Sequence, residues 1–211
     1  MNKNKLIEKM IETAKKLVAE NISCEGDRVS ERYRDGLIIN KPDVNLVDLT
    51  AADFIIKQRG DELDADEALH MAIYGYKTDR NAIILNTAPY CGIVARNAKK
   101  LPALLDDFAQ IVGLTAKVAK TDGVMDVLSC VQGSRNACII KTGKSLALGR
   151  TIEEAFTGSL VLEKGAKAFV EATILGNPQK IGFIDAKIMN IIYKKKYSIQ
   201  TQAALMEDVK E

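Results

Sequence analysis

Residues 81–96, NAIILNTAPYCGIVAR, limit what this chain can fold into more than any other segment. Residues 82–85 are apolar and have the length and β-branched content of a buried strand, and Pro89 stands where a helix can begin. A strand-to-helix turn is therefore expected at residues 85–88. Side chains at the end of a buried strand lie beside the pocket that the following loop encloses. Side chains that are two positions apart in a strand, here Leu85 and Thr87, point to the same side. The segment thus predicts a ligand site at this turn.

Other elements follow from periodicity and from capping residues. Apolar residues recur at three- and four-residue steps between positions 6 and 18, which predicts an amphipathic helix of about four turns. Asp64 and Glu67 form a capping-box pair that opens a second helix, and Thr151 and Glu154 form another that opens a long one. Strands are expected at residues 27–30, 37–40, 54–57, 116–119, 137–141 and 145–148, with 116–119 at a sheet edge. Further helices are expected at residues 101–113, 123–131 and 184–197.

Composition bounds the class of protein. The chain has 211 residues and no linker rich in Ser, Gly or Pro, so we expect a single domain over residues 1–211. Its formal net charge of +2, from 30 Lys and Arg and 28 Asp and Glu, creates no field that would select nucleic acid or an anionic membrane. The apolar runs are too short to cross a bilayer, and the N-terminus lacks the apolar region of a signal peptide. The 4 cysteines form no CxxC pair, which favours free thiols in a reducing cytoplasm.

Three motifs, in this order, resemble the class II aldolase/adducin family, which includes fuculose-phosphate aldolase and ribulose-phosphate 4-epimerase. Residues 66–74, DEALHMAIY, resemble its acid-x-x-x-His-x-x-x-Tyr helix; residues 85–90, LNTAPY, its His-Thr-His-Pro-Pro-Tyr turn; and residues 149–155, GRTIEEA, its Gly-x-Thr-Leu-Glu-Glu-Ala segment. The resemblance runs from about residue 6 to residue 197. It implies a three-layer α/β fold with a mostly antiparallel central sheet and helices on both faces. It also implies a homo-oligomer, most commonly a tetramer, with sites between subunits.

The family's catalytic zinc is held by three histidines, and this chain differs at all of those positions. Without gaps, the resemblance places Leu85, Thr87 and Gly143 there, or Thr142 in place of Gly143 if the alignment slips by one residue. These residues offer at best a hydroxyl and a backbone oxygen, where zinc sites use nitrogen or thiolate ligands. We therefore expect no metal and no other cofactor. His70, the single histidine, is expected to be a packed, hydrogen-bonded helix residue, as it is in the family.

The family's phosphate-binding residues are also largely replaced. A Thr-Gly turn in the family falls on residues 42–43, where an aspartate would repel phosphate and a proline has no N–H to donate. Two small hydroxyl residues of the family fall on Asp64 and Ala65. Residues 20–23, ENIS, resemble the family's Gly-Asn-Ile-Ser, which makes Asn21 and Ser23 candidate ligand-binding residues. Helix capping and turn formation explain Asn21 and Ser23 equally well.

Three residues remain as candidates for chemistry. Asp66 stands where the family has its general acid/base, although an acid in the first turn of a helix also complements the helix dipole. Tyr197 lies near the position of the family's tail tyrosine and could complete a proton-transfer pair. Lys144 could bring a positive charge into the pocket or, if desolvated, form a Schiff base; the alternative is an exposed turn lysine.

Two functions follow from these observations. The first is a non-catalytic binding or structural homologue, with a small anionic or sugar-like ligand as its partner. The second is a divergent lyase (aldolase) or epimerase that acts on a small sugar phosphate or another hydroxy-carbonyl compound. The presence of a bound metal would distinguish these two functions, because in the family's chemistry zinc polarises the carbonyl and stabilises the enediolate.

Overall fold

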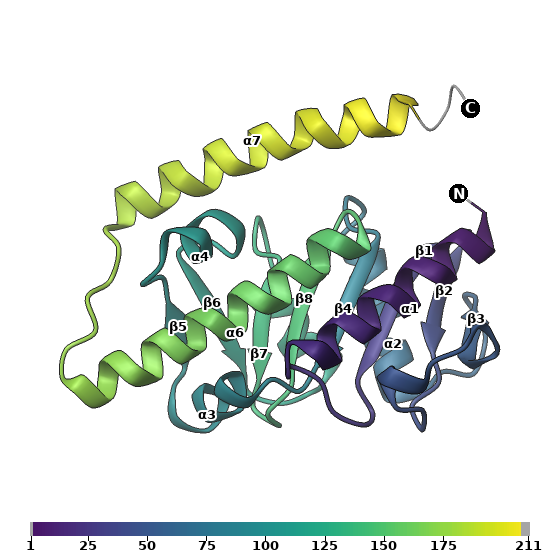
Figure 1. The fold of residues 1–211 in the computed structure, drawn as a ribbon, viewed down its shortest axis with the longest axis horizontal. Helices are drawn as coiled ribbons and strands as arrows, with labels where there is room; N and C mark the ends of the chain where they lie inside the picture. The colour runs from purple at the N-terminus through teal and green to yellow at the C-terminus, as the bar shows by residue number, and fades with distance from the viewer. Residues whose placement is uncertain (1, 208–211) are drawn as a thin grey trace.

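The computed structural model describes residues 2–207, with the side chains of residues 2–193, 195 and 196 (Figure 1). Its strands form one 8-stranded sheet in the order β3-β2-β1-β4-β8-β7-β6-β5. Neighbouring strands are antiparallel except β6 and β7, which run parallel. The strands are β1 (Arg28–Tyr33), β2 (Gly36–Asn40), β3 (Phe54–Lys57), β4 (Ala82–Asn86), β5 (Lys100–Pro102), β6 (Thr115–Ala119), β7 (Ala137–Ile140) and β8 (Ser145–Gly149). The mostly antiparallel sheet that the family resemblance implied is confirmed.

Helices cover both faces of this sheet, as expected (Figure 1). One face carries α1 (Lys3–Ala19), α3 (Pro89–Asn97), α4 (Asp106–Ile111) and α6 (Ile152–Leu175), and the other carries α2 (Ala65–Tyr76) and α5 (Val124–Cys130). Alternation along β4 divides the core between the faces: Ile84 joins the cluster under α1 and α6, while Ile83 and Leu85 join the cluster under α2. The short 3-10 helices η1 (Leu46–Asp48) and η2 (Ala51–Asp53) connect β2 to β3, and α7 (Phe183–Glu207) packs on α4.

Capping residues fix the helix ends near the loops of interest. Asp64 caps α2 in a complete capping box with Glu67, as predicted. Asn21 follows α1 with a φ of 56°. The Asn21 N–H donates to the Val18 carbonyl and the Ile22 N–H donates to the Leu17 carbonyl, and this pair of bonds is a Schellman motif. Thr151 caps α6 by accepting the Glu154 N–H at 3.2 Å, but the Glu154 carboxylate accepts from Arg150 instead of completing the second box.

Three expectations about the second half of the chain were wrong. Residues 101–113 do not form one helix: β5 comes first, and α4 begins only at Asp106. Proline disfavours helical backbone in the residue before it, and Leu101 is fully buried in a strand paired with β6. Because β5 lies outside β6, residues 116–119 are not at the sheet edge. The last helix, α7, also continues past residue 197 to Glu207. Among the described helices, none has both the length and the hydropathy needed to span a membrane.

Candidate functional site

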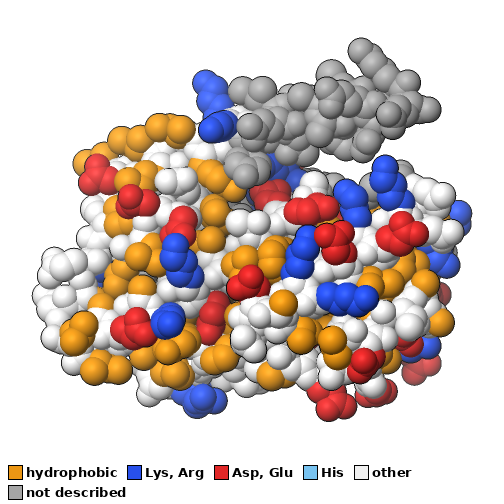
Figure 2. Space-filling model, in the orientation of Figure 1, with side chains coloured by type: hydrophobic (Ala, Val, Ile, Leu, Met, Phe, Trp, Pro, Cys, Tyr) orange, Lys and Arg blue, Asp and Glu red, His pale blue; other side chains and the backbone are white. Residues whose placement is uncertain are grey.

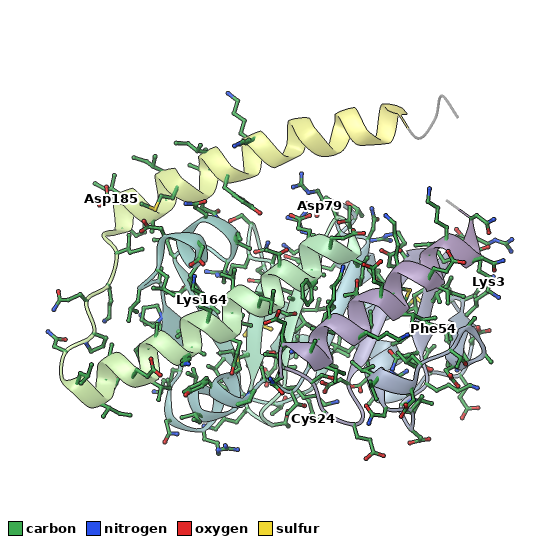
Figure 3. The ribbon with its side chains drawn as sticks, in the orientation of Figure 1. Lys3, Cys24, Phe54, Asp79, Lys164 and Asp185 are labelled. Carbon is green, nitrogen blue, oxygen red and sulfur yellow. The ribbon has the colours of Figure 1, made fainter. Side chains whose placement is uncertain are left out.

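Most of the residues predicted to matter lie at one end of the sheet. β4 and β7 finish at this end, and β1 and α2 begin there. Cys24 marks this end in Figure 3, and Asp79, in the loop after α2, marks the opposite end. The turn predicted at residues 85–88 therefore faces the turn between β7 and β8 and the first turn of α2.

The two main candidates for chemistry are in direct contact. Lys144, from the turn between β7 and β8, places its Nζ 3.1 Å from a carboxylate oxygen of Asp66 in the first turn of α2. Their side chains are 33% and 26% exposed, so the pair is half-buried. Lys144 is thus held by an acid, unlike Lys141, which is exposed and donates to the Arg96 carbonyl at 3.0 Å. This pair can move a proton or hold a polar group, and each charge is already balanced by the other.

A buried arginine that the sequence analysis missed lies beside this pair. Arg28 is 1% exposed, and its guanidinium is 2.9 Å from Asp64 and 3.5 Å from Glu67, which also pairs with Lys57 at 3.1 Å. Partial burial acts to raise the pKa of Asp64, but the Glu67 N–H and Arg28 outweigh it and hold that pKa below its ordinary value. The sequence held one sign that Arg28 would be at a site: it directly precedes Val29, a residue of the core, at the start of a strand.

His70 is packed and hydrogen-bonded, as expected. Its Nδ1 is 2.7 Å from the Ser30 hydroxyl, which is also 2.8 Å from the Tyr74 hydroxyl. Burial and, to a smaller extent, the positive charges of Arg28 and Lys144 together lower the pKa of His70 to about 3, so the ring is neutral near pH 7. Among the buried side-chain atoms that have no hydrogen-bond partner in the described part of the chain, three belong to this site: His70 Nε2, Arg28 Nε and Arg28 Nη2.

The turn after β4 is tied down by polar contacts. Thr87 donates its hydroxyl to Asp27 at 2.9 Å and its N–H to the same carboxylate at 3.1 Å. Burial raises the pKa of Asp27, against the effect of the N–H groups of Cys24 and Thr87. Asn86 donates to the Ile22 carbonyl at 2.7 Å and accepts from Ser145 at 2.8 Å. These bonds fasten the loop after α1 to the middle of the sheet.

The residues at the expected zinc-ligand positions do not fit a zinc ion. Leu85 is aliphatic and fully buried under α2, the Thr87 hydroxyl is committed to Asp27, and Gly143 has only backbone at a φ of 105°. A zinc site needs nitrogen, thiolate or carboxylate ligands that converge. Within residues 2–207, wherever side chains are described, no three His, Cys, Asp or Glu are grouped to hold a metal.

The remaining candidates differ in how close they lie to this site. Asn21 is exposed and lies in the C-terminal cap of α1, which is the capping role that we gave as the alternative to ligand binding. Ser23 contacts Asp27 by a side-chain hydrogen bond, which places it beside the turn after β4. Residues 42 and 43 form an exposed turn beyond β2. Tyr197 lies in α7, and its side chain is outside the part of the chain that the structure describes.

Comparisons with known proteins agree with the architecture. The family model for the class II aldolase and adducin N-terminal domain matches residues 12–170. An L-fuculose phosphate aldolase of Escherichia coli (strain K12) is 28% identical over 111 residues, which cover 49% of this chain and about half, 52%, of that protein. A second, from Escherichia coli O6:H1, is 22% identical over 215 residues, covering 96% of this chain and 100% of that one.

Solved structures show the same fold. A structure of an L-fuculose 1-phosphate aldolase superposes with a TM-score of 0.81 at 20% identity, over 92% of this chain and 98% of that one. The L-fuculose-1-phosphate aldolase of Thermus thermophilus superposes with a TM-score of 0.75 at 16% identity, over 84% and 100% of the two chains.

Proposed function

Because the chain belongs to the class II aldolase and adducin N-terminal domain family, we propose that it is a non-catalytic binding or structural member that lacks the zinc chemistry. The observation that carries the proposal is that Lys144 and Arg28, two cations of the candidate site that are not fully exposed, are neutralised by the chain itself. Lys144 pairs with Asp66, and Arg28 pairs with Asp64. An electrophile that must hold an enediolate needs positive charge that is not already balanced.

A small anionic or sugar-like ligand is part of this proposal. His70 Nε2 and Arg28 Nε are buried and have no hydrogen-bond partner among the described residues. Buried polar atoms are rarely left without a partner, so a hydroxyl or a carboxylate that reached them would gain hydrogen bonds. A ligand of this kind binds the native state only and should raise the melting temperature.

The test is an activity assay with a matched control. Cleavage of fuculose 1-phosphate and epimerisation of ribulose 5-phosphate are coupled to a dehydrogenase, for wild type, Asp66→Ala and Asp122→Ala. Asp122 is an exposed acid outside the site. We expect no turnover above background in any of the three proteins. A wild-type turnover above about 1 per second that Asp66→Ala abolishes and Asp122→Ala keeps would overturn the proposal.

The second candidate function, a divergent lyase or epimerase on a small sugar phosphate or hydroxy-carbonyl compound, is favoured by one contact. The 3.1 Å contact of Lys144 with Asp66 places an acid beside a half-buried amine, where the acid could shuttle protons during imine formation once the amine has left the ion pair and lost its proton. Condensation of the Lys144 amine with a substrate carbonyl would release water and leave an imine. Incubation with dihydroxyacetone phosphate and borohydride would reduce that imine to a stable adduct. An adduct in wild type that is absent from Lys144→Met would show that Lys144 forms this imine and would favour this function over the first.

We also propose a homo-oligomer, most simply a tetramer, in the cytoplasm. Large apolar side chains stay exposed along the first turns of α7, and Figure 2 shows hydrophobic atoms gathered there: Phe183, Ile184, Ile188, Ile191 and Ile192. Burying such a stripe between copies would be favourable. The cysteines Cys24, Cys91, Cys130 and Cys138 are free, as they would be in a reducing compartment. Light scattering that gave the 23.1 kDa mass of one chain would refute the oligomer.

A further inference from the structure

A recess rich in arginine lies at the end of β1 opposite the candidate site. Arg28 begins β1 beside Asp64, whereas Arg32 lies near the other end of the strand. The recess is lined by Arg32, Arg34, Asp35, Gln58 and Arg59, and its volume is about 510 Å³. This end of the sheet is the one that Asp79 marks in Figure 3. Nothing in the proposed function uses it.

Two closed turns preform the recess. The pairing of Tyr33 with Gly36 leaves a tight loop at the tip of the β1–β2 hairpin. Gly36 packs so closely on the Lys57 carbonyl that any side chain there would collide with it. The turn after β3 is closed by the Gln58 N–H, which donates to Asp61 at 2.7 Å. These contacts hold the arginine of the hairpin tip and the arginine of the neighbouring turn side by side.

Arg32 forms a fixed floor for the recess. Its guanidinium donates to the carbonyls of Tyr74 at 2.8 Å, Lys77 at 3.0 Å and Arg80 at 3.0 Å, around the C-terminus of α2. It also stacks over the Tyr74 ring at 4.9 Å. Carbonyls at a helix C-terminus offset only part of a positive charge, and no carboxylate pairs with this guanidinium among the described residues, so it keeps net positive charge.

Charge in the recess is unbalanced. None of Arg32, Arg34 and Arg59 forms an ion pair with a described carboxylate, and Asp35 is the one acid in the lining. Arg34 and Arg59 are exposed, so their guanidinium groups can reach an incoming anion. The candidate site differs, because there Arg28 and Lys144 are each paired with an acid.

Arg34 also occupies a backbone position that suits glycine. Its φ is 52°, in the left-handed region that residues with a side chain rarely adopt. Its guanidinium lies over the Tyr33 ring, 5.1 Å from the ring centroid. A disfavoured conformation kept by a charged residue points to a use for that residue.

From these observations we propose that the arginine recess binds a small polyphosphate anion. Guanidinium groups bind phosphate oxygens through paired, charge-assisted hydrogen bonds, and arginine is suited to this more than lysine. A volume of about 510 Å³ admits more than one phosphate group. The recess is small and its lining includes the acid Asp35. On the face seen in Figure 2 basic and acidic side chains are intermixed, so that face offers no extended basic surface to a nucleic acid.

Calorimetric titration with pyrophosphate at constant ionic strength tests the proposal. We compare wild type, Arg34→Gly with Arg59→Gln, and the charge-matched control Lys99→Gln with Lys120→Gln, two exposed lysines flanking β5 and β6. Wild type should saturate, the recess variant should bind at least about tenfold more weakly, and the control should stay within about twofold of wild type. Glycine suits the backbone at position 34, so Arg34→Gly alone should keep or raise the melting temperature.

Three outcomes would overturn the proposal. The first is no saturation in wild type below about 10 mM pyrophosphate. The second is a control that weakens as much as the recess variant, which would indicate a general charge effect. The third is equal displacement of pyrophosphate by citrate, which would indicate an unselective anion patch. None of these results bears on the candidate site, so the proposed function stands or falls separately.

Discussion

Replacing Glu31 by glutamine should make the protein more stable as the pH rises, relative to wild type. Glu31 lies in β1, is 4% exposed and is near Glu153, Lys9 and the backbone of Ile152. Burial and the negative charge of Glu153 raise its pKa from 4.5 to about 7. Each tenfold change in proton affinity corresponds to about 1.36 kcal/mol. The ionisation of Glu31 therefore changes the free energy of unfolding by about 3 kcal/mol between low and high pH.

The sign follows from where the proton is bound. Between pH 4.5 and about 7 the folded state keeps the proton on Glu31 while the unfolded chain releases it. The folded state therefore binds more protons, and the free energy of unfolding falls as pH rises through this window. The contribution of Glu31 is complete below pH 4.5 and lost above about pH 7, whereas glutamine does not titrate.

Urea unfolding followed by circular dichroism at several pH values, at one protein concentration, measures this. The free energy of unfolding of Glu31→Gln minus that of wild type should increase by about 3 kcal/mol between pH 4.5 and pH 8. Glu8→Gln removes a carboxyl from the exposed side of α1 and is the control. A difference for Glu31→Gln that did not change with pH, or that changed as it does for Glu8→Gln, would refute the assignment of the buried proton to Glu31.

Three further results are expected. Untagged protein should carry no stoichiometric transition metal, because Leu85, Thr87 and Gly143 stand at the ligand positions; about one zinc per chain by elemental analysis would contradict this. The pKa of His70 is lowered to about 3, so this ring should take stability away from the folded state as the pH falls from 6.5 towards 3, and in a urea series the free energy of unfolding of His70→Gln minus that of wild type should rise over this range. Gly165→Ala should cost about 1–3 kcal/mol, because a methyl group there would collide with the Phe108 ring; an unchanged melting temperature would show that the ring can move aside.

The sequence predicted those elements whose signals are local. β4 followed by a helix at Pro89, the capping box of α2 and the amphipathic α1 depend on neighbouring residues, and all three are present. The prediction of one helix over residues 101–113 failed because a short apolar run has no clear periodicity. Pairing with β6 decided the conformation of the first residues of this segment.

The candidate site could be predicted only in part. Asp66 and Lys144 were each recognised, but they are 78 positions apart, and their contact depends on where β7 and β8 enter the sheet. Arg28 contacts Asp64 across 36 positions for the same reason. No spacing rule brings such residues together, because the order of the strands does so.

That order also determines what the chain exposes while it is being made. β3, β2, β1 and β4 are contiguous in the sheet and are complete once Asn86 has been synthesised, so this half can form first. The other neighbour of β4 is β8, which ends at Gly149. Until those later residues arrive, β4 is a sheet edge whose residues, Ala-Ile-Ile-Leu-Asn, are all buried in the finished protein. An unpaired apolar edge strand can pair with another chain, so a nascent chain that stops before Gly149 is exposed to aggregation in a way that the finished protein is not.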